Sequence, residues 1–328
     1  MAPRPSSPVW RWGWSRPVWS QHLVIRSHAE RAAQLRQGGI TVTELPFRNW
    51  LDLRTGPGLR RILRQWQPQV VLTWMNRATV TMPPGRFVRL GRLGGYYDLK
   101  YYRHCHHLIG NTRDIVAYLV KQGWPAERAH YLPNFVDDRL APAVARAELA
   151  TPDDAVLVLG LGRLHRVKGF DVLLHAIARA PGLHLWIAGD GPERAALTAL
   201  IHSLGIADRV RLLGWRDDVP ALMAAADLLV CPSRHEPLGN VVLEAWAQRL
   251  PVIASAAEGP RELMTSGRNG LLVPIGEADA LAAAMTELGA DPARRAELAE
   301  SGYAAFAADF AAGKVTSAYR DLIERVAA

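Results

Sequence analysis

The stretch AVLVLGLGRLHRVKG, residues 155–169, runs from a continuous apolar segment into a glycine-rich turn with basic side chains. Further short apolar segments follow at residues 183–188, 210–213, 228–231 and 251–254. Between them lie patterns typical of helices, at residues 170–180, 193–204, 219–226 and 240–248. Apolar strands that alternate with helices predict a parallel sheet covered on both faces. The fold class is therefore α/β, a doubly wound domain whose ligands bind beyond the carboxyl ends of its strands.

The N-terminal part predicts a second, similar domain. Its strand patterns lie at residues 23–25, 70–74, 87–90 and 108–110, and its helical patterns at 29–37, 59–65 and 112–122. Residues 1–21 contain neither the apolar strand nor the glycine-rich turn with which such a domain usually opens. We therefore expect an N-terminal domain over residues 1–135 that lacks its first strand and loop. Residues 136–305 would form the C-terminal domain, and residues 306–328 a helix that can cross back to the first.

Composition places the chain among globular proteins. Its 328 residues suffice for two domains, and 49% hydrophobic with 21% charged residues is an ordinary balance. No apolar segment approaches the length that spans a bilayer, and prolines and tryptophans interrupt any secretory signal near the N-terminus. Two cysteines, Cys105 and Cys231, are too few for a disulfide framework. We expect a cytoplasmic protein.

Charge is distributed unevenly along the chain. Residues 1–138 hold 20 Lys and Arg against 8 Asp and Glu, a balance of +12, whereas residues 139–328 hold 19 against 23, a balance of −4. The two add up to the net charge of +8. A basic N-terminal half suggests an anionic neighbour, such as acidic lipid headgroups at the inner face of the membrane or a phosphorylated acceptor. An arginine-rich composition that merely reflects a GC-rich genome explains the basic N-terminal half equally well. No recognition-helix cluster points to nucleic acid.

Two glutamates frame the stretch EPLGNVVLE, residues 236–244. They lie eight positions apart, about 2.2 helical turns. If a helix begins near Gly239, Glu236 precedes its N-terminus and Glu244 lies on its second turn. The amides at such a start favour an anion. A ligand with hydroxyls at both ends and phosphates between them, such as a nucleotide-sugar, fits this layout, although most glutamate pairs of this spacing are simply solvated.

Basic residues emerge from the turn after the first of these strands. Arg163 and Lys168 could both meet a diphosphate, and Gly162 allows close backbone approach. The turn is no dinucleotide fingerprint, because position 165 is His165, and it lacks the order of a Walker loop. Solvated basic side chains remain the alternative here. The turns at residues 189–193 and 213–216 would lie at the same sheet edge, and ordinary turn chemistry explains them as well.

Taken in order, these segments resemble the large family of retaining glycosyltransferases usually numbered four, the group 1 glycosyltransferases, whose fold is the two-domain GT-B arrangement. The likeness covers residues 155–275. The matching segments are residues 160–163 with 168–169, 189–192, 213–214, 232–234 leading into 236–239, 244–245, 251–254, 259–262 and 269–270.

The resemblance implies a role for each matching position. Arg163 and Lys168 would hold the donor diphosphate and, with Glu236 facing the donor sugar, would form the catalytic set. Glu244 would accept hydrogen bonds from the ribose hydroxyls. The other donor-binding positions would be Gly162, Gly214, Trp215, Leu238, Gly239 and Asn240. The family works without a metal or other cofactor, and the chain has no D-x-D triplet.

The resemblance weakens on the acceptor side. Many members have a histidine in the loop that corresponds to residues 91–100, which here offers Tyr96, Tyr97, Asp98 and Lys100 instead. The aromatic run of Tyr96, Tyr97, Tyr101 and Tyr102 could equally well line an acceptor sugar or belong to the core. The function implied is transfer of a sugar from a nucleotide-sugar to a glycan or lipid-linked acceptor, as in envelope polysaccharide or lipopolysaccharide synthesis. The alternatives are a nucleotide-sugar epimerase and a donor-binding protein that has lost turnover.

Overall fold

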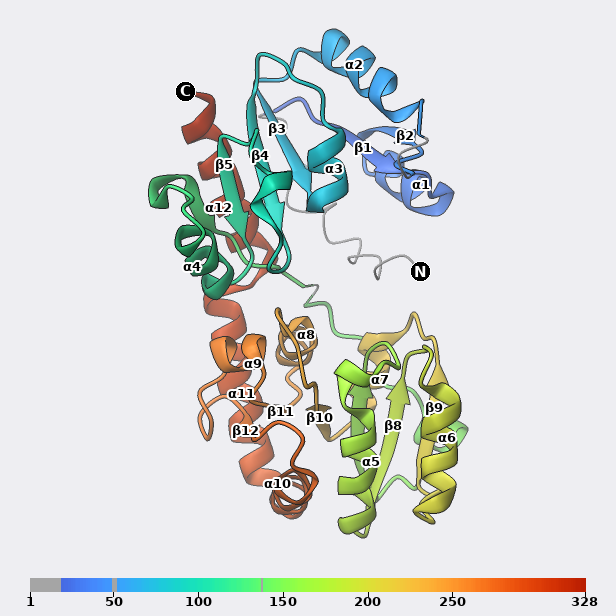
Figure 1. Ribbon diagram of the computed structural model, residues 1–328. Helices are drawn as coiled ribbons and strands as arrows, with labels where there is room; N and C mark the ends of the chain where they lie inside the picture. Colours follow the sequence, from blue (N-terminus) through green and yellow to red (C-terminus); the bar gives the residue numbers. More distant parts are fainter. Residues whose placement is uncertain (1–18, 49–51, 137) are drawn as a thin grey trace. The chain divides into compact units, whose positions relative to one another are not determined.

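The computed structural model describes residues 19–48, 52–136 and 138–328 (Figure 1). The chain divides into two compact units, one formed by Met1–Phe135 with Ala312–Ala328 and the other by Val136–Ala311. The sequence placed the second change of domain at residue 306, but in the structure it falls between Ala311 and Ala312. The reason is that Phe306 and Phe310 are buried in the core of the second unit.

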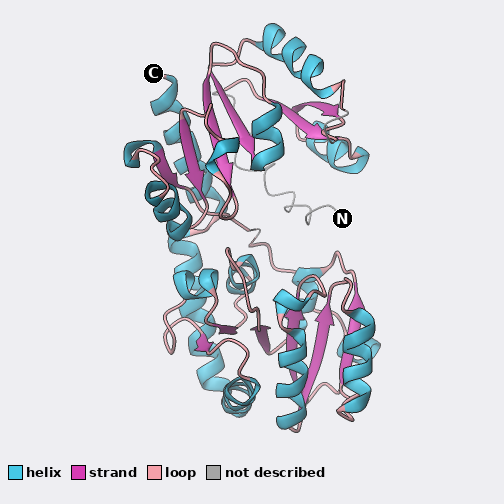
Figure 2. Ribbon diagram, viewed as in Figure 1, coloured by secondary structure: helices cyan, strands magenta, loops and turns pink. Residues whose placement is uncertain are grey.

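Six parallel strands form the sheet of the second unit, in the order β12-β11-β10-β7-β8-β9 (Figure 2). They are β7 (Val156–Leu161), β8 (Leu183–Ala188), β9 (Val210–Gly214), β10 (Leu228–Cys231), β11 (Val252–Ser255) and β12 (Leu271–Val273). The helices of this unit are α5 (Phe170–Arg179), α6 (Arg194–Ser203), α7 (Val219–Ala225), α8 (Asn240–Ala247), α9 (Glu258–Leu263), α10 (Ala278–Ala290) and α11 (Pro292–Asp309).

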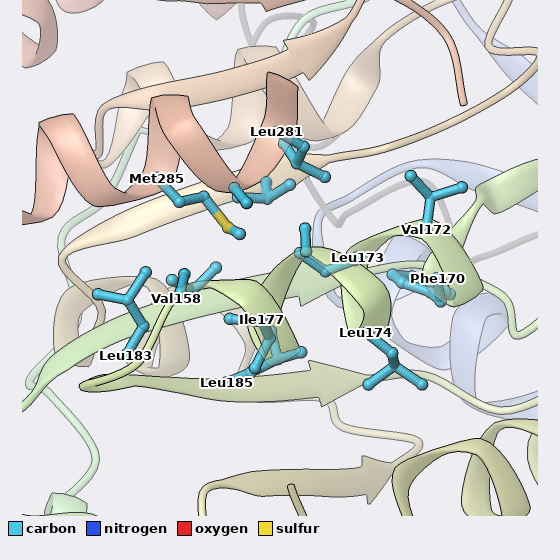
Figure 3. Packing of buried hydrophobic residues seen from close by; sticks show 14 of the residues in the cluster. Val158, Phe170, Val172, Leu173, Leu174, Ile177, Leu183, Leu185, Leu281 and Met285 are labelled. Atoms are coloured by element: carbon cyan, nitrogen blue, oxygen red, sulfur yellow. The ribbon is translucent and has the colours of Figure 1, made fainter. Parts of the chain in front are cut away.

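Helices cover both faces of this sheet, as the continuous apolar strands predict. Successive side chains of a strand point to opposite faces. Val158 and Leu185 accordingly pack against α5 and α10, as the close contact with Ile177 and Met285 shows (Figure 3). The alternate strand residues belong to a second core cluster, together with side chains of α7, α8 and α11. The sheet is thereby buried on both sides, and only its edges and strand ends remain for function.

The first unit contains a four-stranded parallel sheet in the order β3-β4-β5-β6 and a separate parallel pair, β1-β2. The strands are β1 (His22–Arg26), β2 (Thr41–Leu45), β3 (Val70–Trp74), β4 (Val88–Leu93), β5 (His107–Gly110) and β6 (Ala129–Tyr131). The helices are α1 (Ala29–Gln37), α2 (Thr55–Trp66), α3 (Met75–Thr81), α4 (Arg113–Lys121) and α12 (Ala312–Ala327). The prediction of a missing first strand rests on residues 1–21, and residues 1–18 of these lie outside the described residues.

The C-terminal helix α12 is part of the core of the first unit. Val315, Tyr319 and Leu322 pack with buried residues of β4 and β5. The hydroxyl of Tyr319 accepts a hydrogen bond of 2.6 Å from Nε of the buried Arg92, whose guanidinium also lies 4.3 Å from the centre of the Trp74 ring. Arg92 also donates to the side-chain oxygen of Asn134. The cation is thus satisfied by a hydroxyl, an amide oxygen and an aromatic face, and the hydroxyl contact fixes α12 against β4.

Candidate functional site

The strand order of the second unit reverses between β7 and β10. From β7 the sheet continues to β8 and β9, and from β10 it continues to β11 and β12. The loops that leave β7 and β10 therefore run to opposite sides and separate at this point, which is where ligands bind in doubly wound sheets. Lys168 comes from the loop after β7 and Glu236 from the loop after β10. The ammonium of Lys168 forms an ion pair with Oε2 of Glu236.

Glu236 is nearly buried, with 8% of the residue exposed. Besides Lys168, the hydroxyl of Ser233 donates to Oε2 of Glu236 over 3.3 Å. A carboxylate in such surroundings needs these partners, because burial without them would be costly. The neighbouring Cys231 thiol has a pKa raised to about 11, mainly by burial and to a smaller extent by the negative charge of Glu236. The thiol therefore stays protonated and packs as part of the core.

The loop after β7 owes its course to glycine. Gly169 has φ +66°, and a Cβ there would lie 2.0 Å from the carbonyl oxygen of Pro232. Only glycine lets the two loops approach so closely. Gly162 has φ +150°, and a Cβ there would lie 3.6 Å from Cε of Lys168, so the lysine side chain runs back along this glycine.

A second set of contacts ties the two loops together. The amide of Arg234 donates to the carbonyl of Val167 over 2.8 Å. Its guanidinium binds both carboxylate oxygens of Asp171, on the first turn of α5, at 2.7 and 2.6 Å. The hydrogen bonds from Arg234 lower the pKa of Asp171, although partial burial opposes them. A bidentate pair of this geometry fixes direction as well as distance, so it holds the turn that carries Lys168.

The helix after Glu236 begins where the sequence predicts. Gly239, with φ +64°, caps α8, and the helix starts at Asn240. Glu236 thus precedes the helix start, and Glu244 lies half-buried on its second turn. Leu238 is half-buried at the same start. The first-turn amides of a helix have no acceptor within it, so this end of α8 favours an anion.

The remaining predicted positions lie on the loops after β7 and β9. Arg163 is exposed, and its guanidinium forms no hydrogen bond or ion pair with any residue that the structure describes. The carbonyl of Gly214 accepts a 2.7 Å hydrogen bond from Gly189, which joins the loops after β8 and β9. Trp215 follows with 59% of its surface exposed. The structure thus joins Lys168 directly to Glu236. The ligand roles of all these positions, Lys168 and Glu236 included, stay predictions.

No group of three or more His, Cys, Asp or Glu side chains within residues 19–48, 52–136 and 138–328 could hold a metal ion. Over the same residues, none of the helices combines the length and apolar character needed to cross a bilayer.

Comparison with known proteins identifies the family. The family model described as "Glycosyl transferases group 1" matches residues 143–305. The lipopolysaccharide core biosynthesis glycosyltransferase LpsE of Rhizobium meliloti (strain 1021) is 40% identical over 292 residues, which cover 88% of this chain and 85% of LpsE. The chain belongs to the group 1 glycosyltransferases. A second Rhizobium meliloti protein of the same description, LpsD, is 40% identical over 269 residues, 81% of this glycosyltransferase and 78% of LpsD.

Solved structures confirm the fold of the glycosyltransferase. Anabaena HepE, crystallised with UDP, aligns with a TM-score of 0.84 over 99% of this chain and 98% of its own, at 22% identity. The sucrose-phosphate synthase of Thermosynechococcus elongatus aligns with a TM-score of 0.78 over 94% of this chain and 89% of its own. The predicted GT-B fold class is therefore confirmed. The family model and the likeness to LpsE and LpsD confirm the prediction of a glycosyltransferase. The epimerase and the inactive donor-binding protein gain no support from these comparisons.

Proposed function

We propose that this glycosyltransferase moves a sugar from a nucleotide-sugar donor to the lipopolysaccharide core, with retention of anomeric configuration. The observation that carries the proposal is the pairing of Lys168 with Glu236 at the point where the strand order reverses. The names of LpsE and LpsD support the acceptor class, and the UDP of the HepE crystals supports a nucleotide donor.

The chemistry requires fixed positive charge at the diphosphate. Breaking the sugar–phosphate bond leaves an oxocarbenium-like sugar and adds negative charge to the leaving group. Lys168, Arg163 and the first turn of α8 would stabilise that charge where it grows, which lowers the barrier more than it stabilises the bound donor. Glu236 would face the sugar, and Glu244 would hold the ribose. Under this proposal no metal ion takes part.

The experiment is a transfer assay with the purified full chain. A panel of UDP-sugars and other nucleotide-sugars is incubated with isolated core oligosaccharide, in buffer with and without EDTA, and products are identified by mass spectrometry. We expect one donor to be consumed with addition of one sugar, unaffected by EDTA, and NMR of the product to show the donor's anomeric configuration. Conversion of the donor without an acceptor, inversion, or binding without turnover would each contradict the proposal.

We also propose that the first unit rests on an anionic membrane surface through α2. No acidic residue occurs between Asp52 and Asp98, whereas that interval holds eight arginines. Three of them, Arg60, Arg61 and Arg64, are exposed on α2 and form no ion pair with any residue of the described ranges. Leu53, just ahead of the helix, is 84% exposed. Such a basic surface with an apolar edge is attracted to the anionic lipids of a cytoplasmic leaflet.

Vesicle sedimentation tests the membrane proposal. We expect the protein to sediment with phosphatidylglycerol-containing vesicles and not with phosphatidylcholine vesicles, less so at high salt. Changing Arg60, Arg61 and Arg64 to Gln should abolish this binding. The matched control changes three exposed basic residues of α12, Lys314, Arg320 and Arg325, to Gln, which alters the net charge equally. Equal loss in both variants would assign binding to overall charge and reject α2 as the contact.

A further inference from the structure

Glu258, the first residue of α9, contacts Glu236. Oε2 of Glu258 accepts a 3.2 Å hydrogen bond from the backbone amide of Glu236, and Oε1 lies 2.9 Å from Nδ1 of His235. The next residue, Gly259, donates from its own amide to the carbonyl oxygen of Glu236 over 2.7 Å. Both backbone polar groups of Glu236 are therefore held by one dipeptide, at the start of α9.

This dipeptide is itself rigidly placed. It opens α9 directly after β11, and Ala257 before it is completely buried. A Cβ on Gly259 would lie 2.7 Å from both the Glu236 carbonyl oxygen and the Gly239 nitrogen. The backbone of α9 thus approaches the segment from Glu236 to Gly239 as closely as atoms allow, so the position of one determines the position of the other.

The ionised state of Glu258 suits an acceptor of hydrogen bonds. Burial raises the pKa of this carboxyl group, but its own amide, His235 and the Glu236 amide together hold the pKa below its ordinary value. At neutral pH each of its carboxylate oxygens accepts a hydrogen bond, so neither oxygen is available to transfer a proton. These contacts describe a residue that holds another in place.

We infer that Glu258 is a positioning residue, whose carboxylate fixes the backbone of Glu236 and thereby the direction in which the Glu236 side chain meets Lys168. This inference rests on the proposed function, in which Glu236 faces the donor sugar. A carboxylate that must point at a reacting carbon loses its effect when it moves by about 1 Å, which costs on the order of 100-fold in rate. Nothing in the sequence pattern around Glu236 points to Glu258, which lies 22 positions away.

Two substitutions separate positioning from catalysis by the carboxylate itself. Glu258→Gln keeps an oxygen for the Glu236 amide and an NH₂ for His235, whereas Glu258→Ala removes both partners. We expect Glu258→Ala to lower kcat by about 10- to 100-fold with donor KM within about twofold, and Glu258→Gln to stay within about threefold of wild type. Glu287→Ala, an exposed carboxylate on α10, is the matched control and should leave turnover unchanged.

A second measurement does not depend on turnover. In a ¹⁵N TROSY spectrum the Glu236 amide proton, hydrogen-bonded to a carboxylate, should lie downfield, move upfield in Glu258→Ala and return most of the way in Glu258→Gln. An unmoved Glu236 amide in Glu258→Ala, wild-type kcat in that variant, or equal loss of kcat in the Ala and Gln variants would each overturn the inference. If wild type turns over no nucleotide-sugar, the proposed function fails while the spectrum still decides whether Glu258 holds Glu236.

Discussion

The ammonium of Lys168 is paired with the carboxylate of Glu236, so a residue proposed for the donor diphosphate is held by one proposed for the donor sugar. The lysine side chain is 26% exposed and the glutamate side chain 11%. A diphosphate that binds Lys168 must therefore compete with Glu236 for the ammonium or share it. Nucleotide affinity and the pairing of these two residues are coupled.

This competition has a measurable consequence in Glu236→Gln. Without the carboxylate, Lys168 is no longer neutralised, and we expect UDP to bind about 3- to 10-fold more tightly by calorimetry. Transfer should nevertheless fall by about 10²- to 10³-fold, because the group proposed to face the donor sugar has lost its charge. Lys168→Gln is the reciprocal variant and should weaken UDP binding. Weaker UDP binding in Glu236→Gln would show that the pair does not compete with the nucleotide.

Arg163 offers a separate test of charge at the diphosphate. Since its exposed guanidinium has no partner among the described residues, its removal should cost little stability. We expect Arg163→Ala to lower kcat by about 10²- to 10³-fold, and Arg163→Lys to recover only part of that, because an ammonium lacks the bidentate fork. Thermal unfolding is the control and should stay within about 2 °C. Wild-type turnover in Arg163→Ala would remove this residue from the site.

Local pattern was sufficient to predict the second unit because its strands are continuous apolar runs. The predicted helices at residues 170–180 and 240–248 became α5 and α8 with ends shifted by a single residue. Pattern failed where tertiary contact overrides it. Residues 259–262 and 269–273 look like turns because they contain Gly259, Pro260 and Gly270. Residues 259–262 nevertheless lie within α9, and residues 271–273 form β12. Proline is tolerated near a helix start, where its missing N–H would have no partner.

Only part of the candidate site could be predicted from the sequence, because the rest depends on tertiary contacts. Lys168 and Glu236 follow strands that the sequence reveals, and strand ends of a parallel sheet meet at one edge. Contacts such as Arg234 with Asp171 and Glu258 with Glu236 join residues far apart in the chain, so no local spacing announces them. The sequence could not decide whether the tyrosines belong to the core. In the structure Tyr102 is completely buried, whereas Tyr96 is 38% exposed.

The pair of Asp171 and Arg234 predicts a pH dependence of stability. Because the folded-state pKa of Asp171 is lowered, its contribution is present above the ordinary carboxyl pKa near 4 and is lost as pH falls through the folded-state value. The pair is partly exposed, so we expect Asp171→Asn to cost about 1 kcal/mol at pH 7. Thermal unfolding of wild type and variant should converge as pH falls below 4. A difference that is constant with pH would assign the cost to packing alone.

His130, in the first unit, predicts a second pH dependence of stability, one that arises from burial of the group and not from an ion pair. Its Nε2 lies 3.0 Å from Nδ1 of His107, and burial, followed by the charges of His107 and Arg325, lowers the pKa of His130 to about 4. In the unfolded chain His130 therefore binds a proton near pH 6.5, whereas in the folded chain it binds one only near pH 4. The free energy of unfolding consequently falls as pH drops through that interval. Since His130 is only half-buried, the loss should be about 1 kcal/mol. His130→Gln should remove this slope between pH 7 and 5 in thermal unfolding, and an unchanged slope would contradict the assignment.

Alanine substitutions of Gly169 and Gly205 distinguish two causes of destabilisation, a steric clash between the two loops at the site and strain of the backbone conformation. Their φ angles are nearly equal, +66° and +65°, but a Cβ at Gly169 would lie 2.0 Å from the Pro232 carbonyl oxygen, whereas a Cβ at Gly205 would meet nothing within 4 Å. Gly205→Ala should therefore cost only the left-handed conformation, about 1 kcal/mol, and Gly169→Ala at least about 3 kcal/mol in chemical denaturation. Because Gly169 follows Lys168, its variant should also lower transfer while Gly205→Ala leaves it unchanged. Equal destabilisation of the two would mean that the loops after β7 and β10 do not touch as the structure has them.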